Sequence, residues 1–231
     1  MPWGLSGLSE DDLIDWIEAH VSDKTKIRAS GYQGKVYLYQ DEHHRLVIKT
    51  ASGPGLVKRI RQSWLRKEHE VYRRLSGFAG SPRCYGLLRD RYLVLEYIDG
   101  IPFRSAKIAD APAFFDRLFE LIQELHRRGV AHADLKRKDN LLVVEGRTPY
   151  LIDFGAAMIY KPGFAPINHY LYEVARKFDL NAWVKLKYRG KFADISDADR
   201  EYYNQTWIEK IARAVKKRYK KIKSLVLHPN R

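Results

Sequence analysis

Oxygen-bearing side chains gather around a predicted β-hairpin in the middle of the chain. Two short apolar runs, residues 141–144 and 150–152, flank a turn that contains Gly146, a pattern typical of a hairpin. Because antiparallel strands bring these ends together, we expect the side chains there to form one cluster. Those side chains are Asp134, Asp139 and Asn140 before the first run and Asp153 after the second. Such a cluster suits a hard cation such as Mg²⁺, while solvated acids on a surface hairpin are the alternative.

A lysine and a glutamate nearer the N-terminus form a second candidate group. Lys49 ends a strand-like apolar run, so its ammonium group can point into a cleft. Glu68 lies in the apolar stripe of a predicted helix over residues 58–77, because steps of four residues join it to its apolar neighbours. That stripe comprises Ile60, Trp64, Leu65, Val71, Tyr72 and Leu75. A carboxylate on an apolar face is costly unless it is paired, so we expect Glu68 to pair with Lys49; solvated side chains are the alternative.

Two glycines lie in a turn between the first two predicted strands. Gly31 and Gly34, followed by Val36, would let backbone N–H groups approach a phosphate closely. A plain hairpin turn is the alternative, because two glycines three residues apart are a short pattern.

The composition is that of a globular protein. Of the 231 residues, 45% are hydrophobic and 30% are charged, and no apolar run approaches the length of a membrane span, about 18 residues. A single cysteine, Cys84, excludes an internal disulfide, and the N-terminus lacks a secretory pattern, so we expect a cytoplasmic protein. The formal net charge of +14 predicts an anionic partner such as a nucleotide, nucleic acid, acidic substrate or membrane surface.

Apolar periodicity predicts the order of the elements. They are a helix at 9–21, three strands within 26–50, the helix at 58–77, a hairpin at 83–98, a helix at 112–128 and the central hairpin. The segment Asp99-Gly100-Ile101-Pro102 breaks the pattern and marks a boundary between two lobes. The last element is a basic amphipathic helix at 206–223, which would either pack with its basic side in water or bind anionic lipid or nucleic acid.

Taken in order, these motifs resemble those of the protein kinases. The matching segments are the Gly-rich loop at 29–36 (with Ala29 in place of its first glycine), the strand lysine Lys49, its helix partner Glu68, the hinge at 95–98, the catalytic loop at 132–136 and Asp-Phe-Gly at 153–155. The match spans roughly residues 26–160.

The resemblance implies a role for each matched residue in phosphoryl transfer from ATP with Mg²⁺, or alternatively Mn²⁺. The implied roles are nucleotide binding for Gly31, Gly34, Val36, Lys49, Glu68, Glu96 and Ile98, metal binding for Asp153, orientation of the acceptor hydroxyl for Asp134 and charge compensation for Lys136. The second metal ligand is open, because the kinase pattern puts its Asn at Asp139, whereas Asn140 lies one residue later.

The sequence differs from the pattern of regulated protein kinases at two further points. Ala133 replaces the arginine with which many regulated kinases read a phosphorylated activation loop. No Ala-Pro-Glu closes the activation segment, and the sequence that remains is short for the usual later helices, so we expect the peptide platform to be missing.

Trimmed kinases of this sort resemble the bacterial lipopolysaccharide-core (Kdo and heptose) kinases and the RIO-type atypical kinases. We therefore expect an α+β, two-lobed protein-kinase-like fold, with a small antiparallel sheet in the N-lobe and a mainly helical, trimmed C-lobe. One domain, 1–231, would comprise the helix at 9–21, the N-lobe at 22–98 and the C-lobe at 99–231. The segment 175–187 is similar to the helix that both families place after the activation segment, where Asp179 would brace the catalytic loop.

The expected function is transfer of the γ-phosphate of ATP to a hydroxyl group. A lipopolysaccharide-core sugar is the first candidate acceptor, and a protein serine or threonine, as in a RIO-like kinase, is the second. A nucleotide-binding pseudokinase is the third reading, and the presence of Lys49, Asp134 and Asp153 argues against it. The basic segment 206–223 leaves peripheral contact with the inner membrane, and contact with nucleic acid, as open alternatives.

Overall fold

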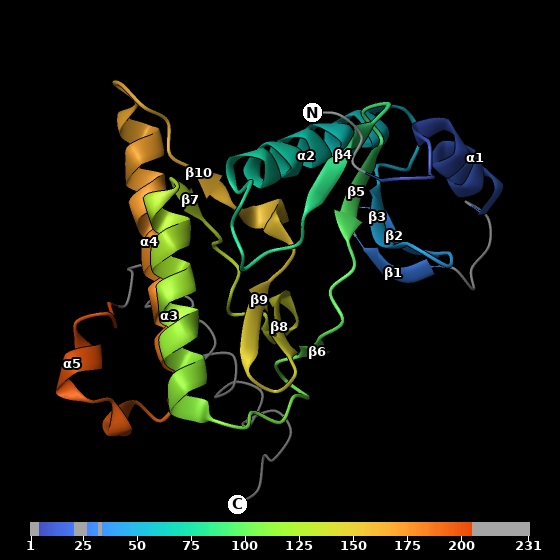
Figure 1. The fold of residues 1–231 in the computed structure, drawn as a ribbon. Coiled ribbons are helices and arrows are strands. Elements are labelled where there is room, and N and C mark those ends of the chain that lie inside the picture. Colours follow the sequence, from blue (N-terminus) through green and yellow to red (C-terminus); the bar gives the residue numbers. More distant parts are fainter. Residues whose placement is uncertain (1–4, 21–26, 32–33, 205–231) are drawn as a thin grey trace, which may run out of the picture.

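The protein has two lobes joined by the chain after residue 96, as the computed structural model shows for residues 5–20, 27–31 and 34–204 (Figure 1). The N-lobe contains an antiparallel sheet of five strands in the order β1-β2-β3-β5-β4. The strands are β1 (Ile27–Gly31), β2 (Gly34–Gln40), β3 (Arg45–Thr50), β4 (Cys84–Leu88) and β5 (Tyr92–Glu96). β4 and β5 form the predicted hairpin, whose turn residues Arg89 and Asp90 have positive φ angles.

Helix α1 (Glu10–His20) covers one face of this sheet. Its buried residues Leu13, Ile14 and Ile17 join a core cluster with Tyr37 and Ile48 of the sheet. Ser9 caps the helix, because its hydroxyl accepts a hydrogen bond from the Asp12 N–H at 3.1 Å, and acidic residues fill the first turn. The predicted helix at 9–21 is therefore confirmed, and it packs on the sheet.

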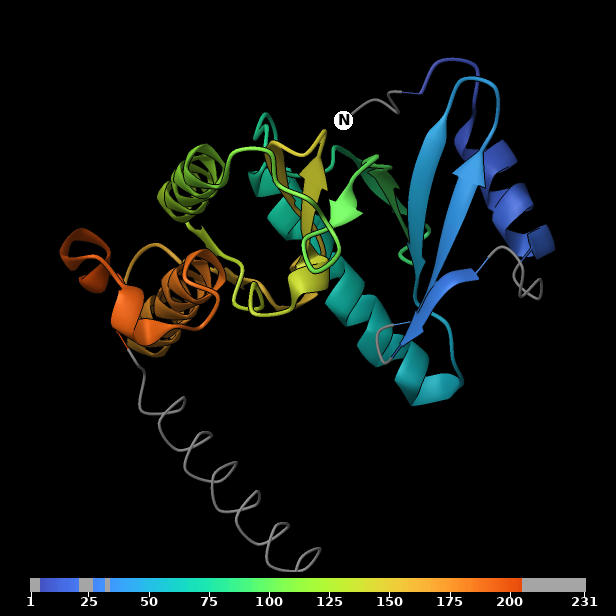
Figure 2. The same cartoon turned by 90° about the horizontal axis from the view of Figure 1, so that it is seen from below.

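Helix α2 (Gly55–Arg74) crosses the opposite face of the sheet. Leu65, Val71 and Tyr72 are buried there, as the apolar stripe predicts. The first part of the predicted stripe is wrong, because Ile60 and Trp64 are each 42% exposed. The helix begins three residues earlier than expected, and its first turns lie beyond β1, where the sheet offers them no surface (Figure 2).

The C-lobe is built on two helices that lie side by side, α3 (Ala111–Arg127) and α4 (Pro166–Lys187). The Trp183 indole N–H donates to the Phe115 carbonyl at 2.8 Å and ties them together. Gly129 follows α3 with a φ angle of 70°, a left-handed conformation typical of glycine after a helix. The short helix α5 (Asp197–Arg200) comes after α4.

Small β-ladders fill the space between these helices and the N-lobe. The predicted central hairpin is confirmed as β8 (Leu141–Val144) and β9 (Thr148–Leu151), and β6 (Ile101–Pro102) pairs with β8. β7 (Val130–Ala131) pairs with β10 (Met158–Ile159). One buried cluster contains Leu93 of the N-lobe sheet together with Leu118 and Trp183 of the helices. The predicted α+β, two-lobed architecture is therefore confirmed.

Two expectations remain, one on a segment outside the described residues and one on the described helices. The basic segment 206–223 lies outside the described residues, so its predicted helix is not tested. Among the described helices, none has the length and apolarity that crossing a membrane requires.

Candidate active site

Three charged side chains from distant parts of the sequence meet between the lobes. β3 holds Lys49, α2 holds Glu68, and Asp153 comes two residues after the end of the strand β9. The Lys49 Nζ atom lies 2.6 Å from Glu68 Oε1 and 2.8 Å from Asp153 Oδ1. The predicted pair of Lys49 and Glu68 is confirmed, and the structure adds the contact with Asp153.

Burial and the shared lysine decide the protonation of this cluster. Burial raises the pKa of Glu68 above its ordinary value, and the nearby lysine offsets this only in part. Burial also acts to raise the pKa of Asp153, but the charge and hydrogen bond of Lys49 outweigh it and hold that pKa below its usual range. Burial acts to lower the pKa of Lys49, while the two carboxylates reverse the direction and raise it. Lys49 and Asp153 are therefore both charged at neutral pH.

A buried aspartate of α4 shapes the loop that carries Asp134. Asp179 accepts hydrogen bonds from the backbone N–H groups of His132 at 2.7 Å and Ala133 at 2.8 Å. It also accepts one from the His126 ring nitrogen at 3.0 Å. Ala133 has a φ angle of 65°, a conformation unusual for a non-glycine residue, and these bonds hold it there. The predicted bracing role of Asp179 is confirmed.

Asn140 and Asp139 point to different partners. Asn140 is buried, and its Nδ2 atom donates to the Asp134 carbonyl at 3.1 Å and to Asp134 Oδ2 at 3.4 Å. Asp139 instead lies 2.9 Å from the Nε atom of Arg104. The Ile152 N–H donates to the Asn140 carbonyl at 3.0 Å, which brings Asn140 next to Asp153. Asn140 therefore lies beside Asp134 and Asp153, whereas Asp139 is paired elsewhere, and the metal role of either residue stays a prediction.

Lys136 stays at the edge of this group. Its Nζ atom lies 4.0 Å from Asp134 Oδ1, and its side chain is 78% exposed. Arg137 approaches the other carboxylate oxygen of Asp134 at 3.8 Å. Both cations are long and solvated, so they can reorient toward a bound anion.

The segment after β9 is held in an unusual conformation. Asp153 has a φ angle of 64°, and Phe154 next to it is buried between the rings of Tyr72 and His132. The Nε2 atom of His132 bonds to the Ile152 carbonyl at 3.0 Å, and its Nδ1 atom has no hydrogen-bond partner among the described residues. These contacts fix the direction in which the Asp153 carboxylate points.

The glycine turn has a structural explanation of its own. Gly34 has a φ angle of 138°, and a Cβ atom there would overlap the carbonyl oxygen of Thr50. The close pairing of β2 and β3 therefore requires glycine at this position whether or not a phosphate binds. Gly31 ends β1, residues 32–33 lie outside the described part, and Val36 pairs with Lys49 across the ladder. A phosphate role for this turn stays a prediction.

The start of the connection between the lobes is hydrogen-bonded to two segments of the N-lobe. The Glu96 N–H donates to the Arg83 carbonyl at 2.8 Å, and the Glu96 carboxylate accepts from the Arg83 N–H at 3.0 Å. The Tyr97 N–H donates to the Arg45 carbonyl at 3.1 Å. Ile98 follows and is half-buried. The adenine contacts of Glu96 and Ile98 stay predictions.

One contributor to the site was missed in the sequence. His126 lies four residues after the buried Ile122 on the apolar face of α3 and bonds to Asp179. A buried histidine at helical spacing was the available signal, but its partner is 53 residues away in the chain.

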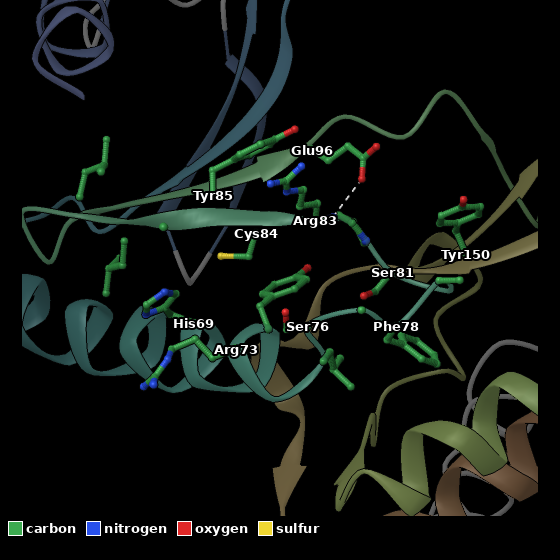
Figure 3. Close-up of a pocket in the computed structure, with 18 of the residues that line it drawn as sticks. His69, Arg73, Ser76, Phe78, Ser81, Arg83, Cys84, Tyr85, Glu96 and Tyr150 are labelled. Carbon is green, nitrogen blue, oxygen red and sulfur yellow. Dashed lines mark hydrogen bonds between the residues drawn. The ribbon is translucent and has the colours of Figure 1, made fainter. Parts of the chain in front are cut away.

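A large cavity lies away from this centre. It has a volume of about 840 Å³ and separates α2 from the edge strand β4, and Cys84 and His69 point toward it (Figure 3). Its lining does not include Lys49, Asp134 or Asp153. Burial raises the pKa of the Cys84 thiol to about 11, so the thiolate is scarce at neutral pH.

A five-stranded N-lobe, a helical C-lobe, and a lysine, a glutamate and two aspartates between them define a protein-kinase-like fold. The comparisons with solved structures agree. The Rio2 kinase from Chaetomium thermophilum superposes with a TM-score of 0.57 at 18% identity, over 85% of this chain and 68% of that one. Its structure as an ADP/Mg²⁺-phosphoaspartate complex also gives a TM-score of 0.57 at 18% identity, over 83% and 66% of the two chains. The predicted protein-kinase-like fold is thus confirmed.

Of two sequence relatives, one is named a kinase. A probable serine/threonine-protein kinase, fnkB of Dictyostelium discoideum, is 27% identical over 50% of this chain and 23% of its own length. A probable bifunctional tRNA threonylcarbamoyladenosine biosynthesis protein of Methanosarcina barkeri is 37% identical over 64% of this chain and 30% of its own length. The chain spans less than a third of either relative. No family model matches the chain.

Proposed function

We propose that the protein is an ATP-dependent kinase that transfers a phosphoryl group to a hydroxyl. The observation that carries this proposal is the contact of Lys49 with both Glu68 and Asp153, next to the loop that holds Asp134 and Asn140. Phosphoryl transfer depends on positioning and on charge neutralisation, which a fixed cation and fixed carboxylates supply.

Each side of the site has a separate task in this proposal. Lys49 binds the phosphates of ATP, and Glu68 holds its ammonium group in place. Asp134 orients the acceptor hydroxyl and takes its proton. Lys136, which is exposed and mobile enough to turn inward, offsets charge on the group in transfer.

The donor atoms fit Mg²⁺. Asp153 offers a carboxylate and Asn140 an amide oxygen, and Mg²⁺ takes one or two such ligands together with substrate phosphates. The described residues contain no group of three or more acidic, histidine or cysteine side chains that could hold a metal ion by themselves, which fits a site completed by the nucleotide. When bound, Mg²⁺ would neutralise charge on the phosphates. The ADP/Mg²⁺ complex of the structural neighbour supports this assignment.

A protein hydroxyl is the proposed acceptor. The relative from Dictyostelium and the structural neighbour carry the names of kinases, and the first of these names specifies serine/threonine-protein kinase. The lipopolysaccharide-core sugar, which the sequence placed first, has no support in these comparisons.

Labelled ATP added to a cell extract tests both steps. The wild-type protein should move label into macromolecules in the presence of Mg²⁺, and the label should be found in protein after protein, lipid and RNA are separated. Label in the lipopolysaccharide fraction would restore the sugar acceptor. Nucleotide binding without any transfer would make the protein a pseudokinase and overturn the proposal.

A further inference from the structure

The first thirteen residues of α2 carry a charge pattern that the fold does not require. This segment, Gly55–Lys67, is called the α2 arm. All its charged residues are cations, and it has no aspartate or glutamate. The cations are Lys58, Arg59, Arg61, Arg66 and Lys67. The next residue, Glu68, is the first acid of the helix and belongs to the active-site cluster.

Helix stability does not explain these cations. The N-terminus of a helix carries partial positive charge, so acidic residues stabilise it and basic residues oppose it. The first turn of α2 has no acid, and Pro54 before it provides no side-chain cap. The arm also neutralises few of its charges within the protein. Arg66 pairs with Asp90 at 3.1 Å, but Lys58, Arg59 and Lys67 form no ion pair in the part of the chain that the structure describes.

An exposed apolar stripe runs along the same arm. Leu56, Ile60 and Trp64 recur every four residues and are 71%, 42% and 42% exposed. Leu56 and Ile60 lie on the side of the helix away from the buried Leu65, and Trp64 lies between the two sides. Figure 2 shows these first turns of α2 projecting past β1 at the outer end of the N-lobe. The stripe therefore has no partner in the described fold.

Apolar and basic features together select the kind of partner. Helices that lie in a lipid–water interface combine Leu and Trp on one face with Lys and Arg around it. A phosphate backbone would use the cations but leave Leu56 and Ile60 in water. We propose that the α2 arm docks on an anionic phospholipid surface, with Leu56, Ile60 and Trp64 entering the interface and Lys58, Arg59 and Lys67 facing the headgroups.

Docking would place chemistry close to the membrane. Trp64 precedes Glu68 by one helical turn, so the lipid-facing stripe and the active-site glutamate belong to one rigid helix. A substrate held at the same surface would then meet the cleft from that side.

Vesicle flotation of the full chain tests the proposal. We expect the wild type to bind vesicles of phosphatidylcholine with about one-third phosphatidylglycerol, to release at about 0.5 M salt, and to ignore pure phosphatidylcholine. The variant Lys58→Gln, Arg59→Gln, Lys67→Gln should bind about 100-fold more weakly, because each cation near an anionic leaflet contributes a factor of about five. The variant Leu56→Ser, Ile60→Ser should also lose binding.

Two control variants separate this surface from bulk charge and from the basic segment 206–223. Lys107→Gln, Arg147→Gln, Lys191→Gln removes the same charge from exposed residues elsewhere and should retain binding within about twofold. Equal loss in that variant would reduce the effect to net charge and overturn the proposal. Loss only on changing Lys216, Lys217, Lys220 and Lys221 to Gln would assign binding to the segment 206–223 instead.

Two further outcomes would also overturn the proposal. Wild-type protein that ignores anionic vesicles but binds single-stranded RNA would make nucleic acid the partner. Because all the changed side chains of the arm are at least partly exposed, we expect the variants to fold, which circular dichroism checks. If the triple variant does not fold, the single changes Lys58→Gln and Arg59→Gln should each weaken vesicle binding about fivefold, and unchanged binding in both would contradict the proposal.

Discussion

The two charged groups of the site, one around Lys49 and one around Asp134, differ in how tightly they are held. Around Lys49, the ion pairs are 2.6 and 2.8 Å long and largely buried. Around Asp134, the nearest cations lie at 3.8 and 4.0 Å on exposed side chains. Fixed charges suit a ligand whose shape does not change, such as a nucleotide phosphate, whereas loose charges suit a group that arrives and leaves. The difference is in keeping with the proposal that the Lys49 group binds the phosphate donor and the Asp134 group orients the acceptor.

The strongest way to break this division is to remove the carboxylate on the acceptor side. Asp134→Asn should lower turnover about 100-fold or more, the range usual for a positioned acid–base group. ATP affinity should stay near that of the wild type, because the Lys49 group is untouched. Steady-state rates and an ATP titration measure the two effects separately. Near-normal turnover would remove Asp134 from the mechanism.

A change on the donor side should affect activity less. Glu68→Gln removes a charge-assisted hydrogen bond to Lys49, and we expect kcat/KM for ATP to fall about 30-fold. Lys49 keeps its partner Asp153, so the variant should remain folded. Kinetics at varied ATP concentration measure this effect. The matched control is Glu70→Gln, which makes the same change at an exposed position two residues further along α2. A loss equal to that of Asp134→Asn would contradict the ranking.

The same variant has a distinct pH signature. The pKa of Glu68 is raised in the folded state, so the folded protein takes up this proton at a higher pH than the unfolded chain does. Charged Glu68 therefore costs stability at pH 7, and that cost disappears as the pH falls toward the unfolded value, about 4.3. As the pH falls from 7 to about 4.5, the free energy of unfolding of the wild type should rise relative to that of Glu68→Gln. Urea unfolding at several pH values measures it, and an opposite slope would contradict the raised pKa.

The pH dependence of stability that Asp153 causes has the opposite sign and lies in a different pH range. Its folded pKa is lowered, so its contribution to stability is present above the unfolded value and is lost only as the pH falls through the folded value. That loss lies below the range used for Glu68, and the two carboxylates can be separated by their pH dependence.

The smallest predicted effect sharpens the choice between neighbouring residues of the loop. Asn140→Ala should raise the Mg²⁺ concentration needed for half-maximal activity about tenfold. Asp139→Ala should change it less than about twofold, because Asp139 is turned toward Arg104. Activity at varied Mg²⁺ measures both, and the reverse order would give the metal role to Asp139.

Sequence patterns predicted the parts of the site that depend on local geometry. Helical spacing placed Glu68 on the apolar face, and the alternation of apolar runs and turns predicted the hairpin that brings Asn140 next to Asp153. The direct contact between Lys49 and Asp153 was not predicted, because it depends on how two lobes approach each other across 104 positions of the chain. The orientation of Asp139 was left open for the same reason, because its partner Arg104 lies 35 residues earlier in the chain, just after β6.

The α2 arm shows a different limit. Periodicity identified Ile60 and Trp64 as one apolar face with Leu65 and Tyr72, but a pattern cannot say where the opposing sheet ends. The sheet covers only the later turns, so the same kind of residue is buried at Tyr72 and exposed at Trp64. Extra cations around an apolar face were the available sign that this part of the helix does not pack inward.

The hydrogen bonds of Asp179 have a consequence for exchange with solvent. Loops usually exchange their amide protons quickly, because small local openings expose them. The amides of His132 and Ala133 are instead hydrogen-bonded to the buried carboxylate of Asp179 in α4, which also binds His126 of α3. Each proton can exchange only when its hydrogen bond to Asp179 breaks. In deuterated buffer, these two loop amides should therefore retain their protons as long as the slowest amides of α3 and α4.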